Sequence, residues 1–142
     1  MYKIMWLLKR KQGISHEQFR EHYERSHVVM AQKYIGHLLL EYTRNYKTET
    51  WGGGVPTDGG GDFGPIEWQY DCVTEWVMPD EASFDQINRI FADPVIGKEF
   101  HDDEENFLDR PSVLLIKCGV VDTGTGDGHG TLSLKRKIGQ LA

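Results

Sequence analysis

The apolar and polar positions of the chain predict four strands. Residues 3–9, "KIMWLLK", are apolar at consecutive positions, which is typical of a strand that is buried on both faces. Similar runs at residues 71–78 ("DCVTEWVM") and 112–121 ("SVLLIKCGVV") predict two more strands of this kind. The segment "LLLEYTRNYK" at residues 38–47 predicts the remaining strand, second along the chain.

Two segments between these strands have the 3.6-residue repeat of a helix. Ser15, with Gln18 three residues later, forms a capping box, so a helix is expected from about residue 16 to residue 34. The second helix has Asp80 as its cap, and an Asp-Pro pair at residues 93–94 restarts it and carries it to about residue 107. The stripe of the first helix places a histidine where a leucine would pack; its members are Phe19, Tyr23, His27, Met30 and Tyr34.

The order of these elements, βαββαβ, predicts an α+β fold of the ferredoxin-like kind, with an antiparallel sheet and helices on one face. Helices can cover only that face, yet three of the four strands are apolar on both faces. We therefore expect a homodimer in which two sheets pack face to face around a barrel-like interior.

Two segments fall outside this unit of residues 1–122. Residues 48–69 carry seven glycines and two prolines without periodicity, which predicts a long loop. A flexible insertion and a binding lid at the mouth of a cavity both fit this composition. Residues 123–142 are polar and then basic, which predicts a C-terminal tail with a short pairing segment at residues 131–135.

Composition narrows the range of partners. The net charge of −6 argues against nucleic acid or an anionic membrane surface, because both require a basic face. The sequence contains no run of about 18 apolar residues, so we expect no membrane span. The apolar start of the chain precedes its basic residues, which is the reverse of a signal peptide. Cys72 and Cys118 both lie in apolar runs, so we expect buried thiols in a cytoplasmic protein rather than a disulfide.

Several of these motifs, in this order, resemble a known family. The stretch "KRKQGISHEQFREHYERSH" resembles the opening of the EthD-like proteins of the dimeric α+β barrel superfamily, and "EYTRNY", "DCVTEW" and "DDEENFLDR" resemble their later motifs. The resemblance covers about residues 1–122. It implies a dimeric α+β barrel that takes a small-molecule substrate without a cofactor. Relatives in the superfamily include polyketide cyclases, decarboxylases, muconolactone isomerases and cofactor-free monooxygenases.

His27 is the strongest candidate for chemistry. Spacing alone favours a core histidine satisfied by a hydrogen bond. The resemblance reverses that preference, because a histidine at this position lines the cavity in muconolactone-isomerase-like relatives. It then suits a general acid or base that acts on a carbon acid or a lactone.

The strands supply the other candidates. Tyr42 is expected on the pocket wall, where it donates a hydrogen bond to a substrate oxygen, whereas Asn45 points to the opposite face and orders the following loop beside the substrate. Ordinary strand packing explains both equally well. Glu75 has the opposite parity to Trp76, so if Trp76 faces the cavity, Glu75 reaches the helices and orients His27; a structural salt link to an arginine is the alternative.

Two tryptophans and an acidic segment are the remaining candidates for a binding or metal site. Trp6 and Trp76 give an aromatic wall that suits a planar substrate, although large aromatics are more often core residues. His101 and Glu105 stand four residues apart, but a solvated acidic helix face explains them better than a metal does. We therefore expect no metal site.

Three functions remain open at this point. The first is a small cofactor-independent enzyme that carries out cyclisation, isomerisation or dehydration on an aromatic, lactone or polyketide-like metabolite. The second is a cofactor-free monooxygenase, and the third is a binding or stress module without catalysis.

Overall fold

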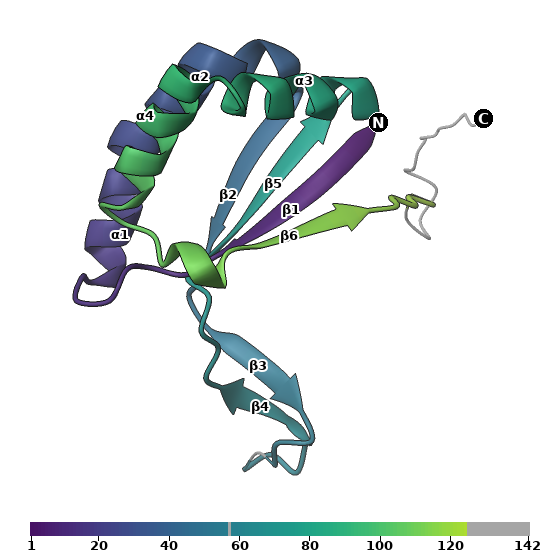
Figure 1. The fold of residues 1–142 in the computed structure, drawn as a ribbon. Helices are drawn as coiled ribbons and strands as arrows, with labels where there is room; N and C mark the ends of the chain where they lie inside the picture. Colours follow the sequence, from purple (N-terminus) through teal and green to yellow (C-terminus); the bar gives the residue numbers. More distant parts are fainter. Residues whose placement is uncertain (57, 125–142) are drawn as a thin grey trace.

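A four-stranded antiparallel sheet forms the body of the protein. The structure, a computed structural model, describes residues 1–56 and 58–124. The strand order is β2 (Glu41–Tyr46), β5 (Cys72–Met78), β1 (Tyr2–Leu8) and β6 (Leu114–Cys118), and every neighbouring pair is antiparallel. All the long helices lie on one face of this sheet (Figure 1). The α+β, ferredoxin-like fold expected from the sequence is confirmed.

The first helix is interrupted by a π-helical turn that the sequence did not predict. The capping box of Ser15 and Gln18 is present and starts α1 (His16–His22). A π turn, η1 (Tyr23–His27), then leads into α2 (Val28–Ile35), and the Val28 N–H bonds the Tyr23 carbonyl five residues back.

This turn shifts the buried stripe by one residue. Met30 and Tyr34, which were predicted to continue the stripe, are only partly buried at the edge of the core, because the extra residue in the turn moves the helix register. The stripe that the structure buries is Phe19, Tyr23, Val28, Ala31 and Ile35.

The second helical segment follows its predicted caps. Asp80 accepts from the Ser83 N–H at the start of α3 (Glu81–Phe91), and Asp93 accepts from two backbone N–H groups at the start of α4 (Pro94–Glu104). Short 3₁₀ turns, η2 (Gly36–Leu38) and η3 (Arg110–Ser112), precede β2 and β6. The acidic C-terminal end of α4 lies next to the π turn, and the two segments pack together.

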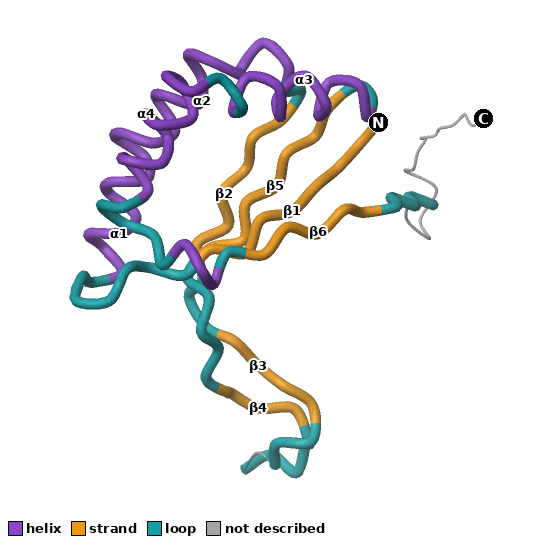
Figure 2. Tube along the Cα trace, viewed as in Figure 1, coloured by secondary structure: helices purple, strands orange, loops and turns teal. Residues whose placement is uncertain are grey.

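The segment in which we expected an unstructured loop contains a hairpin, with paired strands at residues 50–53 and 63–66. Strands β3 (Thr50–Gly53) and β4 (Phe63–Ile66) pair antiparallel and project away from the sheet and helices (Figure 2). A Cβ at position 52 would lie 2.9 Å from Ile66 Cδ1, so the Ile66 side chain would have to move to admit a larger residue. The rings of Trp51 and Phe63 contact each other along the hairpin, with centroids 6.2 Å apart.

The two faces of the sheet have different surroundings. Ile4, Trp76 and Met78 face the helices and belong to the main core. The opposite face is bare in the single chain: Leu114 is 50% exposed and Ile116 is 44% exposed. Among the described residues, no helix has the length and apolar character needed to cross a membrane. Most of the expected tail, with its pairing segment at residues 131–135, lies outside the described residues.

Candidate functional site

A cavity of about 270 Å³ lies between the helices and the sheet. Its wall combines residues of β1, β2 and β5 with residues of the first helix, α4 and η3. The volume is near the lower limit for small-molecule sites, which suits a compact ligand of one or two rings. Large aromatic side chains form much of the lining: Trp6, Tyr23, Tyr42, Trp76, Phe91, Phe100 and Phe107.

His27 lies on the wall of this cavity and is bonded to a carboxylate on α4. Its Nδ1 is 2.8 Å from Oδ2 of Asp103, and its side chain is 13% exposed. The ring packs against Phe107, with centroids 5.1 Å apart, and edge-on against Phe100 at 5.5 Å. The imidazole is thus held by one polar bond and by rings that limit its rotation.

Three donors converge on Asp103. Ser26 Oγ donates to Oδ1 at 2.6 Å, and His22 Nε2 lies 3.0 Å from the same oxygen, in addition to the contact with His27. Burial raises the pKa of Asp103, but the hydrogen bonds from His27, Ser26 and His22 outweigh it and hold that pKa at about 2. Asp103 is therefore an ionised acceptor near neutral pH.

The charge of Asp103 determines the tautomer of His27. An ionised carboxylate can only accept, so Nδ1 must carry the proton that it donates to Asp103. In the neutral ring, Nε2 then has a free lone pair. Nε2 lies 3.9 Å from Oε2 of Glu104, beyond hydrogen-bond distance. Glu104 is instead paired with Arg110 at 2.9 Å, and both residues line the cavity.

Two tyrosines join the helix to the sheet at the cavity wall. The Tyr42 hydroxyl donates to the Tyr23 hydroxyl at 3.2 Å, and Tyr23 shares a 2.8 Å hydrogen bond with the fully buried Thr74 hydroxyl. Burial raises the pKa of Tyr42 to about 12 and raises that of Tyr23 well above its ordinary value. Both phenols are therefore neutral near neutral pH and act as hydrogen-bonding groups rather than bases.

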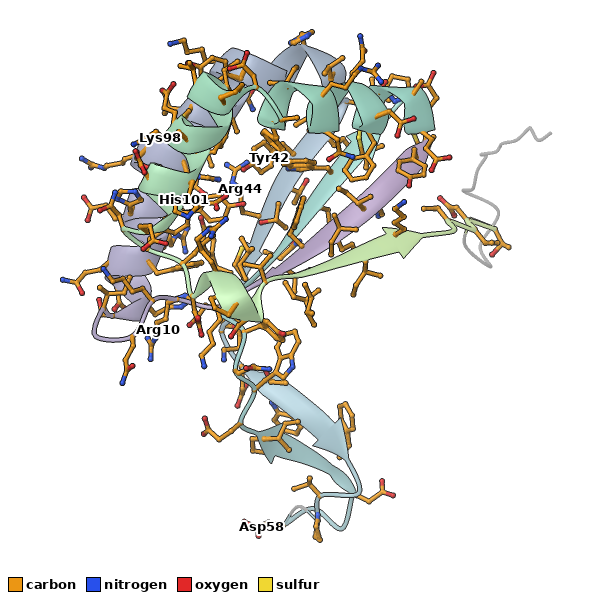
Figure 3. The ribbon with its side chains drawn as sticks, viewed as in Figure 1. Arg10, Tyr42, Arg44, Asp58, Lys98 and His101 are labelled. Carbon is orange, nitrogen blue, oxygen red and sulfur yellow. The ribbon has the colours of Figure 1, made fainter. Side chains whose placement is uncertain are left out.

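Tyr42 is held in place from behind by an ion pair. The Arg44 guanidinium donates two hydrogen bonds to Glu24, at 2.8 and 2.9 Å, and lies 4.8 Å from the centre of the Tyr42 ring. Figure 3 shows Tyr42 and Arg44 between the sheet and the helices, whereas Asp58 marks the far end of the hairpin. The hydrogen bonds from Arg44 lower the pKa of Glu24, which keeps the pair charged.

The expected contact between Glu75 and His27 is wrong. Trp76 does face the cavity, but that cavity lies on the helix side of the sheet, so Glu75 points to the opposite, open face. There Glu75 binds Lys3 at 2.9 Å and accepts a hydrogen bond from Asn45 at 2.9 Å. Asn45 also lies on the open face, where it bonds the Val73 carbonyl, and it does not line the cavity.

No metal site was expected at His101, and the geometry there is that of surface ion pairs. His101 Nε2 lies 3.8 Å from Glu105, and both side chains are about half exposed. Within residues 1–56 and 58–124, no cluster of three or more His, Cys, Asp or Glu side chains could hold a metal ion. Cys72 and Cys118 are free thiols.

Comparison with known proteins identifies the family. The EthD domain matches residues 11–111. The chain belongs to the EthD family. Its fold is similar to the crystal structure of an EthD-family protein from Bacillus halodurans, with 18% identity, 85% of this chain and 99% of that chain covered, and a TM-score of 0.53. It is also similar to an Arabidopsis thaliana protein, with 15% identity, 88% and 100% coverage, and a TM-score of 0.56. A comparison with curated proteins finds no match.

At these identities the neighbours of this EthD chain show the fold alone, so its site must be built from its own residues. Sequence reasoning missed Asp103, Glu104 and Arg110. The signal was present: "DDEENFLDR" is an acidic helix end, and a histidine on a dry stripe needs a carboxylate or carbonyl partner. We interpreted that acidic segment as a solvated face, but Asp103 is only 11% exposed.

Proposed function

We propose that this EthD-family protein is a small enzyme that uses His27 as a general acid/base on an aromatic, lactone or polyketide-like metabolite. The pair of His27 with the ionised Asp103 carries the proposal. It resembles the usual support of a catalytic imidazole, in which a carboxylate fixes the tautomer and stabilises the imidazolium after proton uptake.

In this proposal, Nε2 of His27 takes a proton from the substrate and later returns it. Asp103 holds Nδ1–H in place throughout and remains ionised. The aromatic wall excludes water and orients a planar substrate against the ring. Cyclisation, isomerisation and dehydration all need such a transfer of one proton between two substrate atoms, so they fit a single imidazole without a cofactor.

The proposed active form is a homodimer in the cytoplasm. Met5, Leu7, Leu114 and Ile116 form pairs of apolar side chains on the open face of the sheet, where Met5 faces Ile116 and Leu7 faces Leu114 in register. A second sheet packed on this face would cover them. Free thiols on β5 and β6 suit a reducing compartment.

The test is proton exchange from carbon. A panel of aromatic ketones and aryl lactones is incubated in D₂O, and the loss of their acidic C–H signals is followed by NMR. We expect the wild-type protein to accelerate exchange for part of the panel and His27→Gln to reduce that acceleration by about a hundredfold or more. Equal rates for the wild type and His27→Gln would contradict the proposal and leave a binding module as the better description.

A further inference from the structure

Two buried hydrogen-bond donors at the cavity have no acceptor. The indole N–H groups of Trp6 and Trp76 are inaccessible to solvent, and within the described residues neither has a hydrogen-bond partner. Both side chains line the cavity. A buried donor without an acceptor destabilises the folded chain, so such groups are rare unless a ligand or water completes them.

The two indoles occupy neighbouring positions on one wall. Ile4 pairs with Trp76 and Trp6 pairs with Thr74, so the tryptophans are diagonal neighbours on the helix-facing side of β1 and β5. Their rings meet edge to face with centroids 5.4 Å apart. Trp76 is 5% exposed, which makes it a fixed donor rather than a mobile surface side chain.

The phenolic donors of the same wall are already used. The Tyr42 proton is donated to Tyr23, and the hydrogen bond between Tyr23 and Thr74 occupies the next hydroxyl. Trp76 lies near enough to the Tyr42 hydroxyl to oppose the rise that burial causes in the pKa of Tyr42, but it makes no hydrogen bond of normal geometry there. A ligand oxygen at this wall would therefore find its free donors on the indoles, and not on Tyr42 as the sequence suggested.

We infer that Trp6 and Trp76 form a donor pair that recognises a carbonyl oxygen of the substrate. The inference rests on the proposed function and narrows its substrate class to aromatic ketones and related carbonyl compounds. When a proton leaves the carbon next to the carbonyl, negative charge develops on this oxygen, and two indole N–H groups in a mostly apolar cavity would stabilise it. His27 is then the base that removes the proton, and the indole N–H groups donate hydrogen bonds to the negatively charged oxygen.

The test is a binding comparison of two probes with nearly the same shape. The probe 2-acetylnaphthalene has a carbonyl acceptor, whereas 2-ethylnaphthalene has none. We expect the wild-type protein to bind the ketone more tightly, and Trp6→Phe and Trp76→Phe each to weaken ketone binding by about fivefold to tenfold while changing the affinity for the hydrocarbon much less. Trp51→Phe, on the exposed hairpin, is the matched control and should leave both affinities unchanged.

A measurement on the unmodified protein covers the case in which a Trp→Phe variant does not fold. In ¹⁵N-labelled protein, the Nε1–H resonances of Trp6 and Trp76 should move downfield with the ketone but not with the hydrocarbon, and those of Trp51 and Trp68 should stay in place. Equal affinity for the two probes, equal losses of both in Trp6→Phe, unmoved indole resonances, or no binding of either probe would each overturn the inference.

The binding measurements test the donor pair independently of the proposed catalysis, because binding requires no turnover. His27→Gln should retain the preference for the ketone. If that preference is absent but His27→Gln abolishes proton exchange, only the donor pair is wrong. If the preference is present but no exchange occurs with any ketone, the cavity binds carbonyl compounds without the proposed catalysis.

Discussion

Nδ1 of His27 lies 2.8 Å from Oδ2 of Asp103, and this contact joins the π turn of the first helix to the C-terminal end of α4. The π turn moves every later side chain of the helix by one position, so that Val28 rather than His27 continues the buried stripe. His27 is thereby released from the core to meet Asp103 and the cavity. π turns inside α-helices often occur at functional sites.

The tautomer of His27 gives a first prediction that needs no substrate. Free histidine prefers the Nε2–H form, whereas Asp103 should hold neutral His27 as Nδ1–H. We expect ¹⁵N–¹H correlation spectra of histidine-labelled protein above the pH of imidazole titration to show the Nδ1–H pattern for His27. In Asp103→Asn this preference should weaken, because a carboxamide can also donate. A dominant Nε2–H form in the wild type would show that the base faces the wrong way.

Asp103 should also control stability in acid. Its folded pKa of about 2 is below the ordinary value of 3.8, so its contribution is complete above about pH 4 and is lost as pH falls toward 2. A shift of this size corresponds to about 2 kcal/mol of unfolding free energy. We expect Asp103→Asn to lower the unfolding free energy near neutral pH by about that amount and to flatten its pH dependence between about pH 4 and pH 2, as measured by urea denaturation.

Asp102→Asn is the matched control for that experiment. Asp102 is the preceding residue, but its side chain is 57% exposed and, within residues 1–56 and 58–124, its ion pairs are with Lys98 and His101 on its own helix. Exposed pairs of this kind contribute little to folding, so its loss should change the unfolding free energy by less than about 0.5 kcal/mol. Similar losses in both variants would mean that Asp103 has no special role in stability.

The sequence was sufficient for the fold because its signals are local. Consecutive apolar residues in β1 and β5, and caps at Ser15, Asp80 and Asp93, act within a few residues and agree with one another. The sequence did not predict the hairpin, because glycines in β3 and β4 leave too few side chains to show the alternating pattern of a strand. The two segments are recognisable as strands only from their pairing.

The site was less accessible because it depends on distances between elements. The alternation of side chains along a strand correctly placed Glu75 and Trp76 on opposite faces of the sheet. It could not show which face meets the helices, because the strand is apolar on both faces. We therefore gave Glu75 the place that Asp103 occupies. His27 and Asp103 are 76 residues apart in sequence, and only the packing of the first helix on α4 brings them together.

The hairpin should be dispensable for the cavity. None of its described residues lines the cavity, and its base is closed by a 2.9 Å hydrogen bond from the Lys47 N–H to the Asp71 carbonyl. We expect replacement of residues 49–68 by Asn-Gly, a favourable two-residue turn, to leave the melting temperature and the affinity for 2-acetylnaphthalene nearly unchanged. A large loss of ketone binding would favour the binding lid over the flexible insertion, the two alternatives that the composition left open.

The open face of the sheet gives the last prediction. Leu114 and Ile116 are about half exposed on the edge strand β6, and in register they extend an apolar strip across Leu7 and Met5 of β1. Patches of this kind on a single chain mark association surfaces, and a second sheet is the partner with a matching shape. We expect light scattering at micromolar concentration to show a dimer for the wild type and a monomer for Ile116→Asp, because the new charge would be buried without a partner. Val95→Asp is the control, since Val95 is 75% exposed on α4, on the opposite side of the fold, and it should leave the dimer intact. A wild-type monomer would show that the open face is not an association surface. A dimer that Val95→Asp disrupts and Ile116→Asp does not would place the association surface on the helices instead of the sheet.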